Sequence, residues 1–585
     1  MSTPLANSRP MAWPSVTAPM DVKSQPDRVA WGRWRSVTNV RAVEINRAMR
    51  REGWKLFGSE TEHPNCDLYD QHGVGERLTS LYLHKTIRRG NSGNRFYAAS
   101  QTAIWRNRTD GGWQNVLIGA SPDTDWSFTS QNDLVVAANG KTMFYQRASD
   151  SSFSAIPSLA LIGVAGAAVV WTYENCVFAA DLFMDNTRVS NRVIWSHINS
   201  LNFEPSTDTI AGFKDLDPGC QILGAYPTGS TVVLITTHGA WRLGVADGQF
   251  AFQRLYFSKI RDACAVSRNA IASNRDIVFF VAADGIYAIS SYSQAPEFVE
   301  WASAGLSRDW TKDSRCRINA SGYDPTRNEI YFSSREMGMT YAINTRTTST
   351  SLIDAAFDAI LYADIDRSMD VSQWWVSAGI CTAATFEANH PIGPSDDARI
   401  YPEVSGTATI CTPFAPPCDE CAGIPQLVVV TSSDGCIKAF DEDFHARQTR
   451  AAGGTVVDSA YGSQLVTGAL NFGTEINKRI SRITVDFTAP VTDTPRELTV
   501  KVLCGGSAFD PMNPLAVRTW TLSPRKLAAV IPPGSDSPGT NPLGWSLMTD
   551  SRFLAIVFQI DPCTGGNVTL SNFTATIGAS PLKTV

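Results

Sequence analysis

The sequence predicts an all-β protein, and three observations lead to this expectation. Short runs of β-branched and aromatic residues recur along most of the chain, separated by polar turns that usually contain glycine. No window keeps the i, i+3, i+4 apolar spacing of an amphipathic helix beyond about two turns. Charged residues make up only 18% of the 585 residues, against roughly 25% in an average globular protein, which disfavours long solvated helices.

The runs pair into hairpins with a loose period of about 40 to 55 residues, close to the ~40–50 residues of a four-stranded propeller blade. The first six hairpins begin at Arg95, Asp133, Asn175, Ser230, Arg275 and Asn328, and another begins at Gln426. Their turns carry glycine where a tight hairpin favours positive φ, at Gly140, Gly239, Gly285 and Gly435. Residues 56–455 are therefore expected to form a β-propeller of about six to eight blades.

Three segments flank or interrupt this propeller. Residues 1–55, rich in proline at the start, read as an N-terminal arm followed by a first strand. Residues 365–425, approximately, are rich in proline, cysteine and aspartate and read as an insertion between blades. Residues 456–585 contain further strand-like runs separated by Pro, Gly and Asp, which predict a C-terminal β-sandwich.

The charge pattern limits the classes of partner. The net charge of −6 disfavours sequence-nonspecific binding of nucleic acid by charge alone, although a mildly acidic wall would let DNA pass. Arginines between Arg28 and Lys55 leave a phosphate-binding patch as an alternative, but the alternation in WGRWRSVTNVRAVEI favours a strand with a solvated face. The apolar stretch Leu159–Trp171 is shorter than the ~20 residues that span a bilayer, and the N-terminus shows no export signal. We expect no membrane-spanning segment.

No enzymatic template fits the chain, so we expect no catalytic residues and no enzyme. The one local cluster of interest is formed by cysteines, with a CDEC pair at its centre. Four thiolates could hold a structural zinc ion, two disulfides could staple the insertion, or the thiols could remain unlinked. The candidate ligands are Cys411, Cys418, Cys421 and Cys436, and no other cofactor is expected.

With the hairpins in place, the order of segments resembles a family of bacteriophage virion proteins, the propeller-bearing tail nozzle or hub proteins of short-tailed phages. The most specific likeness lies in STVVLITTHGAWRLG and RDACAVSRNAIASNRDIVFFVAADGIYAIS. NVRAVEINRAMRREGWKLFG, SFTSQNDLVVAANGKTMFYQ and NRVIWSHINSLNFEP are also similar, and NFGTEINKRISRITVDF looks like the start of the family's terminal sandwich. The resemblance covers roughly Val40 to Ile343 and, more loosely, Gly468 to Ile577.

The resemblance implies a structural protein of the phage tail, made in the host cytoplasm. It implies a homo-oligomer, a hexameric ring that continues the DNA channel below the head-to-tail adaptor and serves genome retention and ejection. Adaptor proteins and tail fibres or spikes would be its neighbours, and genome DNA would pass without sequence-specific binding. Two alternatives remain open: a glycan-degrading tail enzyme of the sialidase or depolymerase kind, and a non-viral propeller scaffold.

Overall fold

The computed structural model describes the chain in segments. They are residues 9–56, 77–84, 95–107, 113–255, 264–310, 318–363, 399–404, 407–411, 426–441, 446–450, 456–467, 478–488, 498–505, 516–522, 543–551, 553–560 and 569–579, apart from gaps at 14, 16, 25–28, 30–31, 122, 148 and 275. Strands dominate these segments, so the all-β prediction is confirmed. The described helices are short: α2 (Pro157–Leu161), α3 (Glu300–Ala304), and the 3-10 turns η2 (Arg268–Ala270) and η3 (Arg308–Trp310).

Five successive segments of the chain each fold into an antiparallel four-stranded sheet. Units one and two contain β6 (Ser80–His84), β7 (Arg95–Ala99), β8 (Ile104–Asn107), β9 (Trp113–Leu117), β10 (Ser127–Gln131), β11 (Leu134–Ala138), β12 (Met143–Gln146) and β13 (Ser154–Ala155). Units three to five contain β14 (Val164–Tyr173), β15 (Cys176–Met184), β16 (Thr187–Trp195), β17 (Gly212–Asp215), β18 (Ile222–Thr228), β19 (Thr231–Thr236), β20 (Gly239–Ala246), β21 (Gln249–Leu255), β22 (Ile271–Ser273), β23 (Ile277–Val281), β24 (Ile286–Ser290) and β25 (Glu297–Phe298).

Two further units belong to larger sheets. Unit six is β26 (Ala320–Asp324), β27 (Glu329–Ser334), β28 (Met339–Asn344) and β29 (Ser349–Ile353). Unit seven is β30 (Phe357–Ala363), β33 (Gln426–Thr431), β34 (Ile437–Asp441) and the N-terminal strand β5 (Gly53–Leu56), continued by β35 (Arg447–Arg450) and β36 (Val456–Ser459). The N-terminal strand β5 therefore completes unit seven, whose other strands come from the last part of the propeller sequence.

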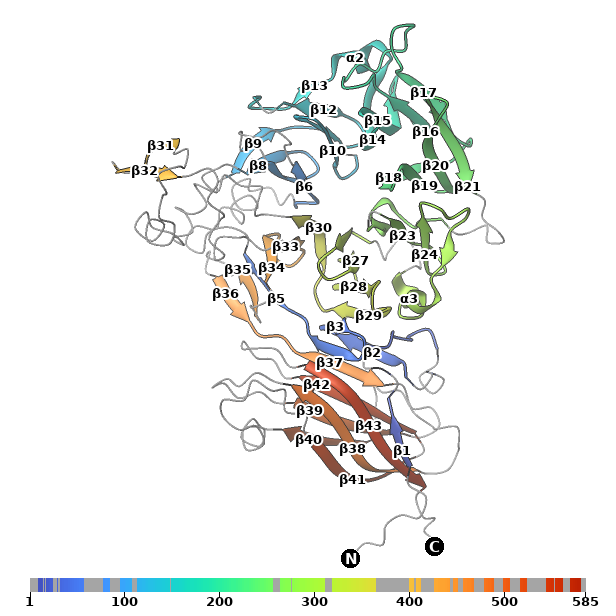
Figure 1. Ribbon diagram of the computed structural model, residues 1–585, viewed down its shortest axis with the longest axis vertical. Helices are drawn as coiled ribbons and strands as arrows, with labels where there is room; N and C mark the ends of the chain where they lie inside the picture. The colour runs from blue at the N-terminus through green and yellow to red at the C-terminus, as the bar shows by residue number, and fades with distance from the viewer. Residues whose placement is uncertain are drawn as a thin grey trace, which may run out of the picture.

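The units form a closed β-propeller (Figure 1). Within the described segments, seven innermost strands follow one another around the ring, from β6 through β10, β14, β18, β22 and β26 to β30, and β30 returns to contact β6. This number lies within the predicted six to eight blades. Apolar side chains fill the space between neighbouring sheets, as where Trp171, Phe178 and Leu234 pack between units three and four.

Apart from the hairpin of β31 (Arg399–Val404) and β32 (Thr407–Cys411), the remaining strands form two sheets below the propeller (Figure 1). One continues unit six: β29 pairs in parallel with β2 (Trp34–Thr38), and the sheet runs on through β37 (Ser463–Thr467), β42 (Phe553–Ile560), β39 (Leu498–Gly505) and β40 (Ala516–Leu522). The other contains β3 (Val40–Glu44), β4 (Arg47–Arg50), β43 (Thr569–Ala579), β38 (Lys478–Thr488) and β41 (Leu543–Ser551), with β1 (Arg9–Ala12) beside β43. That these sheets form a sandwich stays a prediction.

Strand pairing joins residues of the three regions that the sequence predicts, which are 1–55, 56–455 and 456–585. The arm does not stand apart, because Trp13 and Met20 are buried in a core shared with units five and six. Leu465 and Phe558 of the terminal sheet belong to the same core. The apolar stretch Leu159–Trp171 runs through α2 and most of β14 in unit three. None of the described helices has the length and apolar character needed to cross a bilayer.

Three of the four turn glycines have the positive φ that the sequence predicts: Gly140 (92°), Gly239 (135°) and Gly435 (69°). Gly285 does not, so that part of the prediction is wrong. A Cβ at Gly285 would lie 2.6 Å from Ser303 Oγ and 2.7 Å from Phe298 Cε2. Close packing of α3 and β25 against the turn, rather than backbone conformation, therefore requires glycine at this position.

Candidate functional site

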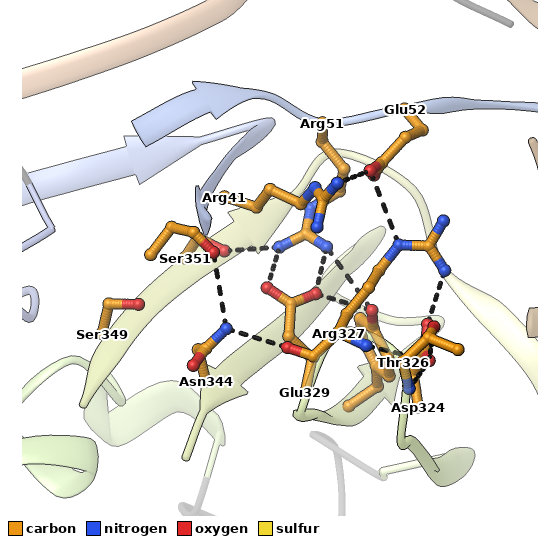
Figure 2. Close-up of polar contacts among 12 residues, drawn as sticks. Arg41, Arg51, Glu52, Asp324, Thr326, Arg327, Glu329, Asn344, Ser349 and Ser351 are labelled. Carbon is orange, nitrogen blue, oxygen red and sulfur yellow. Dashed lines mark hydrogen bonds and ion pairs between the residues drawn. The ribbon is translucent and has the colours of Figure 1, made fainter. Parts of the chain in front are cut away.

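A cluster of buried charges lies where the N-terminal strands cross unit six, and we name it the junction cluster. Arg51, which follows β4, donates through Nη1 to Glu329 Oε2 at 2.5 Å and through Nη2 to Oε1 at 3.2 Å. Tyr331 donates to the same carboxylate at 2.6 Å, and Ser351 accepts from Arg51 at 2.9 Å (Figure 2). Both charged side chains are almost fully buried. This two-pronged pairing fixes distance and orientation together.

A second row of charges completes the junction cluster. Glu52 pairs with Arg41 on one side and with Arg327 Nε at 3.5 Å on the other. Arg327 in turn donates to Asp324 Oδ2 at 2.6 Å (Figure 2). The turn after β26 sets this geometry, since Asp324 also accepts from the backbone N–H groups of Thr326 and Arg327. Positive and negative groups therefore alternate from the N-terminal strands into unit six.

The environment keeps the charges of Arg51, Arg327 and Glu329 in place. Burial by itself would raise the pKa of Glu329, but the charge of Arg51 and hydrogen bonds from Arg51 and Tyr331 outweigh it, so the pKa lies below its usual value. Burial opposes the charge on Arg51 and Arg327, yet the neighbouring carboxylates raise the pKa of both guanidinium groups. Burial raises the pKa of Tyr331 well above normal, which keeps its hydroxyl a donor.

Arginine and aromatic rings extend this contact towards unit seven. The Arg447 guanidinium lies 4.5 Å from the Trp54 ring centroid and 4.2 Å from that of Tyr461, and Arg50 lies 4.3 Å from the Tyr461 ring. Arg50 also donates to the Tyr461 carbonyl at 2.7 Å. Arg50 and Arg51 follow the segment 31–45, whose alternation predicts a solvated face, and both are 1% exposed. Arg50 is buried against Tyr461, and Arg51 is buried against Glu329 of unit six.

A second buried cluster lies at one end of the propeller ring, and we name it the axial cluster. At its centre is Asp181, which sits at an irregular position of β15 with a φ of 55°. Arg188 donates to its two oxygens at 2.7 and 2.6 Å, and Gln221 and Arg268 donate to Oδ2 at 3.0 and 2.9 Å. Four donors surround this fully buried carboxylate, which is about its whole hydrogen-bonding capacity.

The axial cluster joins units that are not neighbours in the ring. Arg268 precedes β22 of unit five, but it bonds to Asp181 and to the Ala168 carbonyl of unit three. The next residue, Asn269, donates at 3.0 Å to Asp125, which precedes the first strand of unit two. Because these bonds reach across the ring, the segment around Arg268 lies over the propeller axis. The arrangement holds units two, three and five together across the ring.

The predicted cysteine site is only partly within the described residues. Cys436 is buried in the turn between β33 and β34, with its Sγ 3.7 Å from the Asp434 carbonyl oxygen. Cys411 ends β32 (Thr407–Cys411), which pairs with β31 (Arg399–Val404), whereas Cys418 and Cys421 lie outside the described residues. Within the described segments, no three His, Cys, Asp or Glu side chains are arranged so that they could hold a metal ion. A zinc ion or disulfides here stay predictions.

Neither charge cluster is predicted from the sequence, although the strand runs contain one signal. Asp181 is a single acid inside the apolar strand run CVFAADLFM, and Glu329 is the first residue of the strand run EIYFSS. A charged side chain that is buried with such a strand needs an oppositely charged partner. Burial of an unpaired ion costs on the order of several kcal/mol. That reasoning identifies the acids but not their arginine partners, which come from distant segments.

No family model matches this sequence. No curated protein matches it either. Solved structures that align with it include the β-propeller domain of Cps50 (Swd1) from Myceliophteria thermophila, at 13% identity over 49% of this chain and 90% of that chain, with a TM-score of 0.31.

Two other solved structures align at similar levels. YCF48 bound to a D1 peptide aligns at 10% identity over 67% of this chain and 96% of that chain, with a TM-score of 0.35. PorZ, a surface component of the type-IX secretion system of Porphyromonas gingivalis, aligns at 9% identity over 49% of this chain, with a TM-score of 0.30. The match spans only 34% of the PorZ chain. Likenesses at this level assign no function, and the β-propeller itself is evident from the sheets.

Proposed function

We propose that this protein is a structural component of a bacteriophage tail, a rigid wall segment of a ring of identical copies through which the genome is retained and then ejected. The observation that supports it best is the continuous sheet that joins unit six of the propeller to the terminal strands through β2 and β37. The junction cluster fixes that connection with buried, paired charges. A segment of a pressurised channel must keep its shape, and such a connection resists bending.

The axial cluster supports a particular route for DNA in this proposal. The segment around Arg268 covers one end of the propeller axis, so the genome would pass through the centre of the ring of copies rather than through a propeller. The net charge of −6 suits such a wall, because a mildly acidic surface does not hold phosphate groups. The side chains of the wall would act by position and shape, without making or breaking bonds.

Assembly of the purified protein tests the proposal. We expect light scattering after gel filtration to give the mass of a ring, hexameric by the family resemblance, and negative-stain images to show an axial hole. Particles that lack the protein should package DNA but fail to retain it. A monodisperse monomer that stays monomeric beside the adaptor would contradict the proposal. Release of reducing sugar from host-surface glycans would instead favour the glycan-degrading enzyme.

A further inference from the structure

The outermost strand of unit four differs from the other outer strands of the propeller. Among the described units, β9, β13, β17 and β25 contain two to five residues, while the outer strands of units six and seven are covered by β2 and β35. β21 is seven residues long and pairs with β20 over its whole length without a bulge. It contains neither proline nor lysine, and Arg254 is its one charged residue, so it has few of the devices that normally protect an open sheet edge.

The turn that precedes β21 shows which backbone groups face outward. Asp247 and Gly248 have φ values of 52° and 75°, as in a two-residue type I′ turn, and Ala246 pairs with Gln249. That closing pair is hydrogen-bonded. Along an antiparallel ladder, hydrogen-bonded pairs alternate with pairs whose N–H and C=O groups point outward. The N–H and C=O groups of Phe250, Phe252 and Arg254 therefore point away from β20. A strand added at this edge could therefore form backbone hydrogen bonds with these three residues of β21.

Aromatic side chains of units three and four lie beside this edge. The Trp195 ring lies 5.7 Å from the Phe250 ring and 5.9 Å from the Phe252 ring, so the outer ends of units three and four meet through aromatic contacts. Trp195 donates to the carbonyl of Ile210, whose side chain is 43% exposed. A strand laid along β21 would place alternate side chains over these rings. The edge thus offers backbone hydrogen bonds and apolar area together.

Another part of the chain forms a hairpin that also has an open edge within the described segments. The hairpin of β31 and β32, inside the insertion between β30 and β33, pairs with no other strand of the described segments. A lone two-stranded hairpin is marginally stable in water and gains most from joining a larger sheet. The β32 sequence, TATIC, has no charge and no proline to block its open edge. Figure 1 places this hairpin and β21 on opposite sides of the ring of units.

We propose that β21 of one copy receives β32 of a second copy, so that the two sheets join into one across the subunit interface. The inference rests on the proposed assembly of identical copies and names the surfaces that would form it. Because the two surfaces differ and lie on opposite sides of the molecule, each copy can bind one neighbour at β21 and another at β32. Such head-to-tail contacts close into a ring when the rotation between copies permits.

Arg254→Pro is the sharpest test. Proline removes an outward N–H from the edge but no hydrogen bond to β20, and residue 254 lies on the exposed rim. Arg254→Thr is the matched control, because it also removes the ion pair with Asp217 but keeps the N–H. We expect Arg254→Thr to assemble like the wild type and Arg254→Pro to have the mass of one copy. Circular dichroism and the melting temperature should show that both variants fold.

A second variant tests the partner strand. Replacement of residues 399–411 by a short Gly-Ser linker should also give a monomer. Mixed with Arg254→Pro, it should form one-to-one dimers that do not grow, since one variant keeps β21 and the other keeps β32. If the wild type forms a ring and folded Arg254→Pro forms the same ring, or if the mixture stays monomeric, this interface is wrong while the proposed function stands. A wild type that never assembles overturns both.

Discussion

Glu329 shows what a single buried charge contributes at the residue scale. Glu329→Gln keeps the side-chain size but leaves Arg51 buried without its counter-charge. Removing one partner of a buried pair costs about 3–5 kcal/mol, so we expect a decrease of that order in the free energy of unfolding measured with urea. Glu44→Gln is the control, because its carboxylate is 64% exposed and lies 4.0 Å from Arg47. That change should cost less than ~1 kcal/mol. Equal costs would contradict the role given to the junction cluster.

His84 makes stability depend on pH at the same scale. It lies opposite Arg95 on the neighbouring strand, and neither ring nitrogen has a hydrogen-bond partner within the described segments. Burial, reinforced by the charge of Arg95 and opposed by that of Asp133, lowers the pKa of His84 to about 4. In the unfolded chain the pKa is about 6.5. Between these values the unfolded chain binds a proton that the folded protein does not, so stability is complete above about pH 6.5 and falls as the pH decreases.

The His84 effect can be separated from other titrations. We expect the free energy of unfolding to drop between pH 7 and pH 5 by up to ~2 kcal/mol because of this group. His84→Leu should lack that part of the drop, whereas His238→Leu, at an exposed position, should keep it. Urea unfolding at a series of pH values measures both. A pH profile of His84→Leu that matches the wild type would show that another group is responsible.

At the scale of elements, the closure of unit seven depends on β5. The strand pairs with β34 on one side and with β35 on the other, so it holds the two ends of the described propeller together. A Cβ at Gly53 would overlap the carbonyl oxygen of Ala446, which accepts a hydrogen bond from the Trp54 backbone at 3.1 Å. Glycine is therefore needed for the close approach of these two segments.

Substitution of this glycine tests the closure. We expect Gly53→Ala to lower the free energy of unfolding by ~1–3 kcal/mol, the usual cost of an overpacked position. Gly244→Ala in β20 is the matched control, because the nearest atom to its Cβ, Thr231 Cγ2, lies at a comfortable 3.7 Å. That variant should stay within about 0.5 kcal/mol of the wild type. Thermal melts of the two variants that coincide would show that β5 does not fit tightly in unit seven.

At the scale of the whole molecule, the propeller and the terminal strands share one core. Trp34 and Leu465 of the terminal sheet, Phe279 of unit five and Ile330 of unit six belong to the same buried cluster. We therefore expect these parts to unfold together, with tryptophan fluorescence and far-UV circular dichroism giving coincident urea transitions. Trp34→Ala should shift both signals equally, by ~3–5 kcal/mol. Two separate transitions, of which only one responds to Trp34→Ala, would contradict a shared core.

The individual hairpins of this protein can be predicted from the local sequence. Hairpins such as 133–146 follow from neighbouring runs of β-formers and from turn residues such as Gly140, whose φ of 92° glycine adopts at little cost. Because each hairpin closes within about a dozen residues, its register depends on no other part of the chain. The all-β class and the range of six to eight blades follow from repeating that unit.

Only the tertiary structure decides which distant segments meet. Arg51 and Glu329 are 278 positions apart, and nothing in either local sequence selects the other as its partner. The same holds for β5 beside β34, and for β2 between β29 and β37. Such contacts form only when cores, such as the one around Trp34, bring whole sheets together. Local turn preferences define the hairpins, whereas the burial of shared apolar surface determines where they are placed and which charges they enclose.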